Sequence, residues 1–343
     1  MITVTATIST KDRYNTTLPL AINSIIHQNY KPDKLIIFDD GEQKDLREDS
    51  LYVNLLSHLQ KSGIKWQIVF GEKKGQVYNH RKALQIAGTD WIWRMDDDEI
   101  AEHDVLEKLM KNIDDSVGAV GGLIIDPKNL EDRYQGPFPP NKIEDIFSSP
   151  NIQWFKSYEK ESFEVDHLYS SFLFRVKAAS NGYCMNLSPV GHREEIIFTH
   201  EIKRQGWKLL VDPKAITWHY RNPEGGIRSY QDESMWENDE NIFKEKIKLW
   251  NVNLDKSKII ILDSGLGDHI AFAMVLPEIL KKYKNITLAA CYPDVFEDFH
   301  INIISIADSK KLVNDFESHS VYIWMYNNKW KKSLIEAYKE MYL

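Results

Sequence analysis

The chain has 343 residues, of which 43% are hydrophobic and 27% charged, and its 51 acidic residues outnumber its 43 lysines and arginines by eight. This ordinary globular composition excludes disordered and fibrous proteins, and the length predicts about two domains with sizeable cores. The acidic surplus argues against a protein that binds nucleic acids through their phosphate backbone, since that binding depends on lysine and arginine.

Membrane and secreted proteins are also disfavoured. The longest apolar stretch, at residues 270–276, is far shorter than the ~20 residues that span a membrane. The amino terminus lacks the basic segment and apolar core of a secretion signal. The two cysteines, Cys184 and Cys291, do not make a disulfide framework and fit a reducing compartment. We therefore expect a cytoplasmic protein without a transmembrane segment.

Predicted strands and helices alternate along the first 125 residues. Apolar, β-branched runs predict strands, and apolar residues spaced three or four apart predict helices. Strands of this kind form a doubly wound, mostly parallel α/β sheet with helices on both faces, and such sheets bind ligands at the carboxyl ends of their strands. The predicted strands are residues 3–8, 35–38, 66–70, 91–95 and 119–125, and the predicted helices lie near residues 18–26, 45–61, 77–87 and 105–113.

The rest of the chain has a different organisation. Residues 126–165, which are rich in Pro, Asp and Asn, are predicted to be an irregular excursion. A helix at 194–205 and two strands, parted by Asp212-Pro213, follow it. The predicted parts are a first domain at 1–222, a lid or linker with a connecting helix at 223–256, and a small α/β Rossmann-like half domain at 257–343.

The sharpest local signal is the run Asp96-Asp97-Asp98-Glu99, directly after a predicted strand. Adjacent carboxylates repel one another unless a cation compensates them, and a hard divalent cation with oxygen ligands does so. The alternative is structural, because Asp98 or Glu99 would also cap a following helix and interact with its positive end. The run alone leaves both interpretations open.

The order of four features gives this run a context. They are a loop at Ser9–Arg13 after the first strand, a helix ending within Ser24–Pro32, a second strand ending in Asp39-Asp40-Gly41, and a helix with Asn79 and Arg81 before the aspartates. This ordered set resembles family 2 glycosyltransferases over residues 1–220. The resemblance implies the GT-A fold, with an Asp-x-Asp motif that binds a metal ion.

The family pattern also implies roles for individual residues. Asp40 would accept a hydrogen bond from the base of the nucleotide, supported by Asp39, and Asp98 would ligate the metal, Mn²⁺ or Mg²⁺. His219 would complete the coordination, since imidazole is a suitable ligand beside carboxylates. The alternative is a histidine that only packs in the core. The residues implied to bind the donor are Thr7, Ser9, Asp39, Asp40, Arg81, Asp96 and Asp97.

Glycosyl transfer to a hydroxyl group needs a base for the acceptor proton and a cation to stabilise the departing diphosphate. Many family members have Glu-Asp at the start of a helix beyond the metal motif, with the second acid as base, and the resemblance predicts an inverting reaction. This chain has Glu194-Glu195 at that place. We therefore assign Glu195 as the catalytic base, with Glu194 in reserve. The alternative is two acids that only favour the helix amino terminus.

The carboxyl-terminal unit begins with the run Asp263–His269. This run resembles the start of heptosyltransferase-like family 9 proteins of the GT-B type. The half of that fold that holds the donor nucleotide is missing, which argues against a second active site. We expect docking or homo-oligomerisation through this unit instead.

Three functions compete at this stage. The first is a hexosyltransferase-like glycosyltransferase of polysaccharide biosynthesis, with a nucleotide-sugar donor (UDP is the commonest carrier in the family) and a glycan or other hydroxyl acceptor. The second is a nucleotidyltransferase, which would want a glycine-rich basic loop after the first strand, whereas residues 9–18 contain no glycine. The third is a non-catalytic carbohydrate-binding or scaffold relative. The presence of Asp96–Asp98 and Glu194-Glu195 argues against it.

Overall fold

The structure is a computed structural model that describes residues 2–41, 45–127, 143, 161–227, 233–250, 257–283, 285–299, 301–309 and 320–343. The chain divides into two compact units. The first holds the described residues before 128 and those from 161 to 250, and the second holds residue 143 and those from 257 onward. The predicted division at residues 222 and 256 stays a prediction.

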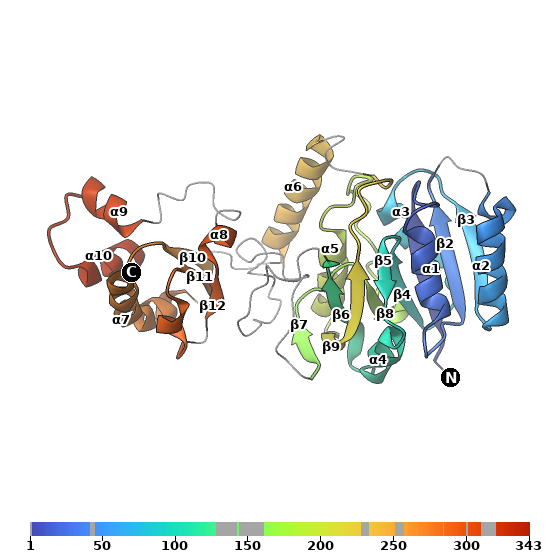
Figure 1. The fold of residues 1–343 in the computed structure, drawn as a ribbon, viewed down its shortest axis with the longest axis horizontal. Helices are drawn as coiled ribbons and strands as arrows, with labels where there is room; N and C mark the ends of the chain where they lie inside the picture. The colour runs from blue at the N-terminus through green and yellow to red at the C-terminus, as the bar shows by residue number, and fades with distance from the viewer. Residues whose placement is uncertain are drawn as a thin grey trace. The chain divides into compact units, whose positions relative to one another are not determined.

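Within the described residues, the first unit is built on a nine-stranded sheet in the order β3-β2-β1-β4-β8-β6-β9-β5, with β7 paired to β9 (Figure 1). The pairs among β1 to β4 and the pair β6–β9 are parallel, whereas β8, β5 and β7 pair antiparallel with their neighbours. The predicted mostly parallel sheet is therefore confirmed. The strands are β1 Val4–Thr10, β2 Lys34–Asp39, β3 Lys65–Phe70, β4 Trp91–Asp96, β5 Glu99–Ala101, β6 Val117–Ile125, β7 Phe163–Val165, β8 Phe172–Arg175 and β9 Lys208–His219.

Helices cover both faces of this sheet, as the apolar strands predict. On β2, Leu35 and Ile37 belong to the main core with α1 and α2, whereas Ile36 and Phe38 pack with Ala83 of α3 on the opposite face. The helices of the first unit are α1 Leu18–Ile26, α2 Ser50–Lys61, α3 Gln76–Ile86, α4 Val105–Lys111, α5 Glu194–Arg204 and α6 Glu233–Leu249.

The strand register brings the predicted site residues to one edge of the sheet. Ser9 of β1 lies opposite Asp96 of β4, and Thr10 lies opposite Asp39 of β2. His219, at the end of β9, pairs with Glu99 of β5, which directly follows the aspartates. Because parallel strands end on the same side, residues distant in sequence meet at this edge.

One alternative left open by the sequence is excluded, and one local prediction is wrong. The segment after the aspartates is the strand β5, which pairs antiparallel with β9, and the next helix starts only at Val105, so Asp98 and Glu99 cap no helix. The two strands predicted around Asp212-Pro213 are the single strand β9, whose register against β6 shifts between Gly122 and Leu123. At this irregularity the Lys214 N–H donates a hydrogen bond to the Asp212 carboxylate (2.9 Å).

The second unit is a small α/β structure, as predicted. Its strands β10 Ser257–Leu262, β11 Asn285–Ala290 and β12 Asn302–Ile304 form a parallel sheet. The core lies between this sheet and the helices α7 and α10, with Phe272, Phe296 and Tyr338 fully buried. The helices are α7 Leu266–Lys282, α8 Ile306–Ser309, α9 Val321–Asn327 and α10 Leu334–Tyr342. Among the described residues, no helix combines the length and apolar character needed to cross a membrane.

Candidate active site

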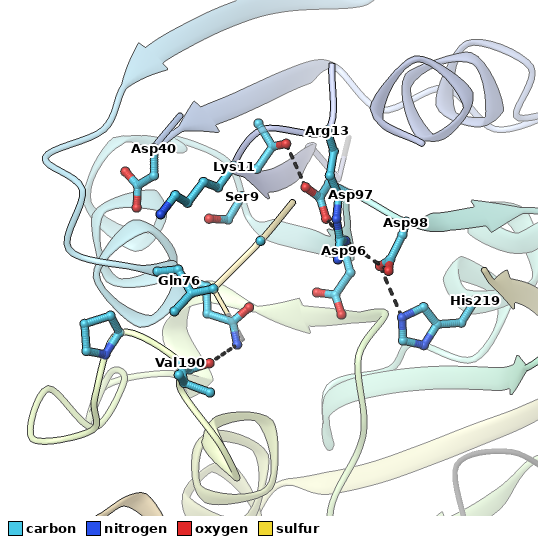
Figure 2. A pocket seen from close by; sticks show the side chains of 14 residues that line it. Ser9, Lys11, Arg13, Asp40, Gln76, Asp96, Asp97, Asp98, Val190 and His219 are labelled. Atoms are coloured by element: carbon cyan, nitrogen blue, oxygen red, sulfur yellow. Dashed lines mark hydrogen bonds and ion pairs between the residues drawn. The ribbon is translucent and has the colours of Figure 1, made fainter. Parts of the chain in front are cut away.

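A pocket lies at the edge where the strands β1, β2, β4 and β9 end (Figure 2). Its other walls come from the first residue of α3, from the loop before α5 and from the segment after β9. The lining residues are Ser9, Thr10, Lys11, Arg13, Asp40, Gln76, Asp96, Asp97, Asp98, Pro189, Val190, His219, Gly226 and Ile227. Six of the predicted site residues therefore share one pocket, namely Ser9, Asp40, Asp96, Asp97, Asp98 and His219.

Asp96, Asp98 and His219 form a cluster suited to a metal ion. One ligand atom from each side chain lies within 4.8 Å of the others. Two carboxylates and an imidazole are a donor set that Mn²⁺ accepts, and the carboxylates alone suit Mg²⁺. The side chains thus fit the predicted cofactor, and Asp96 joins the two residues assigned to the metal from the sequence.

Asp98 is the centre of this cluster. Its carboxylate lies 3.1 Å from His219 Nε2 and 3.0 Å from the Arg13 guanidinium, and it accepts a hydrogen bond from the Asn222 N–H (3.0 Å). Burial opposes the charge of Asp98, but these partners outweigh burial and lower its pKa to about 2. Burial likewise opposes the charge of His219, and the hydrogen bond and charge of Asp98 raise the imidazole pKa to about 9. The two side chains therefore form an ion pair.

Arg13 is a buried cation in the pocket that the sequence reasoning missed. It forms ion pairs with Asp97 and Asp98, and Thr10 Oγ1 donates a further hydrogen bond to Asp97 (2.7 Å). Burial raises the pKa of Asp97 to about 6 even though Arg13 lowers it. The available signal was the position of Arg13 in the loop that follows β1, at the edge of the sheet where ligands bind.

Arg94, also missed, links the metal cluster to the start of α5. Its guanidinium pairs with Glu194 through Nη1, and Nη2 lies 3.3 Å from Asp96 and 3.5 Å from Glu195. The residue is fully buried in β4. A strand places alternate residues on one face, so Arg94 and Asp96 share a face. An arginine inside an otherwise apolar strand, two residues before an acid, was the available signal.

The two glutamates at the start of α5 differ in their surroundings. Glu194 is buried against Arg94, with His80 Nε2 at 3.9 Å, and burial raises its pKa well above the usual range. Glu195 keeps 20% of its side chain exposed. Neither residue lines the pocket, but Arg94 connects both to Asp96. Of these two acids, Glu195 is therefore the one whose side chain is partly open to solvent.

Asp39 and Asp40 have different partners at the end of β2. Asp40 lines the pocket and accepts hydrogen bonds from the N–H groups of Gly75 (3.0 Å) and Lys73 (3.3 Å). Asp39 accepts from Tyr14 Oη (2.7 Å) and Gly41 N–H (2.9 Å), and burial raises its pKa. Asp39 therefore stabilises the turn, while Asp40 faces the space where a donor would lie.

Of the three remaining residues predicted to bind the donor, one lines the pocket and two lie outside it. Ser9 lines the pocket, and its hydroxyl accepts a hydrogen bond from Asn79 Nδ2 on α3 (2.9 Å). Thr7 is buried within β1, and Arg81 on α3 donates to the Asn181 carbonyl (3.4 Å) beside Gly182. Neither Thr7 nor Arg81 lines the pocket. Their contact with a donor stays a prediction.

The carboxylate of Glu240 on α6 gives a prediction for acid stability. It lies 3.1 Å from His192 Nε2 and 3.0 Å from Arg193 Nε. Burial opposes its charge, but the two hydrogen bonds outweigh burial and lower its pKa to about 2. A lowered folded pKa stabilises the fold above the unfolded pKa, and this stabilisation disappears as the pH falls toward 2.

We therefore expect Glu240→Gln to lower the unfolding free energy at pH 7, because it removes the charge that these two partners stabilise. The expected loss is only about 1–2 kcal/mol, since solvent screens part of the interaction. The variant should also lose less stability than the wild type between pH 5 and pH 2. Urea unfolding at several pH values measures both effects. Parallel losses in the two proteins over that pH range would contradict the prediction.

Comparison with known proteins adds to this geometry. Residues 5–174 match the model of glycosyl transferase family 2. This family 2 region contains Asp39, Asp40 and the three aspartates Asp96–Asp98, whereas α5 and His219 lie beyond it. A search of curated protein sequences found no match.

Solved structures resemble the chain beyond the family 2 region. The structure of GalNAc-T7 with UDP, GalNAc and Mn²⁺ matches with a TM-score of 0.53 and 16% identity, over 71% of this chain and 48% of that chain. S. aureus TarS matches with a TM-score of 0.45 and 11% identity, over 82% of this chain and 49% of that chain. The first likeness confirms the predicted GT-A fold. The chain spans about half the length of both structures.

Proposed function

We propose that this chain is a metal-dependent glycosyltransferase that moves a sugar from a nucleotide-sugar donor to a hydroxyl group of a glycan or other acceptor. The observation that carries the proposal is the cluster of Asp96, Asp98 and His219 in a pocket at the carboxyl edge of a GT-A sheet. The family 2 match over the residues that build most of this pocket supports the same reaction class.

The pocket has distinct places for the parts of a donor. Asp40 offers its carboxylate to the base of the nucleotide, at the end of β2, and Ser9 lies between it and the metal cluster (Figure 2). The diphosphate would lie against Asp96, Asp98 and His219, where a bound Mn²⁺ or Mg²⁺ would neutralise the charge that develops on it. Lys11 and Arg13 supply further positive charge in the same pocket. We infer UDP as the nucleotide.

Glu195 is proposed as the base that takes the acceptor proton. As the acceptor oxygen forms its bond to the anomeric carbon, the bond from that carbon to the diphosphate breaks, and the diphosphate leaves with the bonding electron pair. Attack from the face opposite the diphosphate inverts the anomeric configuration. Glu195 is partly exposed, and Arg94 Nη2 lies 3.5 Å from it and 3.3 Å from Asp96, which supports this assignment.

The proposal also includes a biosynthetic role, a location and an oligomeric state. We infer a place for the reaction in polysaccharide biosynthesis and a cytoplasmic location. Homo-oligomerisation through the second unit, and the likeness of that unit to heptosyltransferases, also stay predictions.

A thermal-shift screen tests the proposed function. The wild-type chain is heated with UDP-glucose, UDP-galactose, UDP-N-acetylglucosamine or UDP-N-acetylgalactosamine, each with Mn²⁺ or with EDTA. A ligand that binds only the folded state adds about 2.7 kcal/mol to the unfolding free energy at 100 times its Kd. We expect one UDP-sugar to raise the melting temperature with Mn²⁺ and to do so much less with EDTA.

Two results would contradict the proposal. Stabilisation by UTP or ATP, with release of pyrophosphate, would indicate a nucleotidyltransferase. Stabilisation by free sugars alone, with no response to any nucleotide, would indicate a carbohydrate-binding protein.

A further inference from the structure

The loop at residues 188–193, called the α5 loop below, connects the pocket wall to the predicted base. Pro189 and Val190 of this loop line the pocket. Arg193 at its end directly precedes Glu194 and Glu195, which open α5. A displacement of the α5 loop would therefore move both the pocket wall and the first turn of α5.

Asp239 on α6 binds both ends of the α5 loop. One carboxylate oxygen accepts a hydrogen bond from the Ser188 N–H (2.6 Å). The other oxygen accepts from Ser188 Oγ (2.8 Å) and from the His192 N–H (2.9 Å). Asp239 is completely buried. Asn238 Nδ2, on the same helix, donates a fourth hydrogen bond (3.2 Å). A buried carboxylate is costly unless it is hydrogen-bonded, so these four donors account for its presence inside the first unit.

The end of the α5 loop has a backbone conformation that needs outside support. Arg193 has a φ of 68°, in the left-handed region that a residue with a long side chain rarely adopts. Glu240, the neighbour of Asp239, contacts the side chains of His192 (3.1 Å) and Arg193 (3.0 Å). Two adjacent acids of α6 thus hold the backbone and the side chains of this turn.

The α5 loop is also confined on its opposite side. Gly75, just before α3, has a φ of 89°, and a Cβ at this position would collide with the backbone of Pro189. Gln76 Nε2 donates a hydrogen bond to the Val190 carbonyl (3.0 Å). The α5 loop therefore packs between the start of α3 and the acids of α6.

We propose that Asp239 is a positioning residue, which holds the α5 loop so that Glu195 and the wall at Pro189 and Val190 keep their place beside the metal cluster. The role of Glu195 in this proposal rests on the proposed function. Asp40, Asp96 and Asp98 come from the ends of β2 and β4, and none of the hydrogen bonds and ion pairs described for their side chains involves α6. Loss of Asp239 should therefore lower the rate of transfer far more than it weakens donor binding.

The test compares Asp239→Asn with Glu245→Gln. The first change keeps the side-chain shape, but the new amide cannot accept hydrogen bonds through both of its atoms. The second change removes an exposed acid of the same helix, which pairs only with Lys248 among the described contacts. The rate is the release of UDP with Mn²⁺ from the UDP-sugar that stabilises the chain most in the thermal-shift screen. Amide hydrogen exchange of residues 188–196 is measured on the same proteins.

We expect Asp239→Asn to lower kcat by about 10- to 100-fold, because a small misplacement of a reacting group is costly. The donor KM should change less than about threefold, and amide exchange in the α5 loop should become faster. Glu245→Gln should leave all three quantities unchanged. In an E195Q background, Asp239→Asn should cause little further loss of kcat, since it acts through Glu195.

Other outcomes would overturn the proposal. Unchanged exchange in Asp239→Asn would show that the carboxylate does not hold the α5 loop, and faster exchange with unchanged kcat would show that the loop does not position the base. Full activity of E195Q would show that Glu195 is not the base. It would not show that Asp239 fails to hold the α5 loop, because the exchange measurement does not depend on the reaction. If Asp239→Asn does not fold, Ser188→Ala removes only one of the four hydrogen bonds to Asp239 and should give a smaller effect of the same kind.

Discussion

Replacing Asp98 with alanine is expected to abolish the Mn²⁺-dependent part of donor binding. Asp98 is the buried member of the cluster with Asp96 and His219, and its lowered pKa keeps it ionised at neutral pH. Without it, the cluster retains one carboxylate and one imidazole, which hold a divalent ion poorly. Isothermal titration calorimetry with UDP, with and without Mn²⁺, measures the effect. We expect the gain in affinity from Mn²⁺ to fall at least about tenfold, as ligand-sphere changes typically do.

A matched control separates this effect from a general loss of stability. Asp212 is also a buried carboxylate of the first unit, in the same strand β9 as His219, but it accepts hydrogen bonds from Asn112 (2.7 Å) and Lys214 (2.9 Å), away from the pocket. Asp212→Asn should leave the Mn²⁺ dependence of UDP binding unchanged. Asp98→Asn keeps an acceptor for the Asn222 N–H and should still lose metal affinity. Unchanged Mn²⁺-dependent binding in Asp98→Ala would remove the metal site from this cluster.

Local pattern was sufficient to predict the part of the sheet that carries the donor site. The strands β1 to β4 are short runs rich in apolar and β-branched residues, and the helices between them have clear periodicity, so each element is visible without tertiary information. The order of these elements then places Asp40 and Asp96 at one edge. The Asp-x-Asp pattern begins where β4 ends, and this position predicts that its carboxylates lie at the same edge.

The antiparallel strands were beyond this kind of reasoning. The strand β8 has four residues and lies between β4 and β6, which are far from it in sequence. Its pairing depends on long-range contacts that no local pattern records. The strand β5 was hidden for the same reason, because the acids before it are equally typical of a helix start. Its pairing with β9 brings His219 next to the aspartates.

The two missed arginines show why site electrostatics were only partly predictable. The sequence reasoning assigned the compensation of the aspartates mainly to a divalent ion. In the structure, Arg13 pairs with Asp97 and Asp98, and Arg94 lies between Asp96 and the two glutamates of α5. Both arginines are buried, and an arginine in sequence is exposed far more often than buried. Only the ion pairs of Arg94 with Asp96 and with the glutamates of α5 reveal that it belongs to the site.

Replacing Glu195 with glutamine is expected to lower the transfer rate by about 10²- to 10⁴-fold, the usual contribution of a general base. Glutamine keeps the size of the side chain but cannot accept the acceptor proton. Donor binding should change less than about twofold, because Asp40 and the metal cluster are unaltered. The rate is measured as release of UDP from the UDP-sugar that stabilises the chain, and binding is measured by calorimetry.

Glu194→Gln is the matched control, since the two acids are neighbours and both contact Arg94. Glu194 is the closest acid to the buried guanidinium, and removal of one member of a buried pair costs about 3–5 kcal/mol of stability. We therefore expect Glu194→Gln to unfold at a lower urea concentration while it keeps more transfer activity than Glu195→Gln. Glu195→Gln should unfold closer to the wild type, because its side chain is partly exposed and lies farther from Arg94. If Glu195→Gln keeps full activity and Glu194→Gln loses it, the base is Glu194; if both keep it, the base lies on another element.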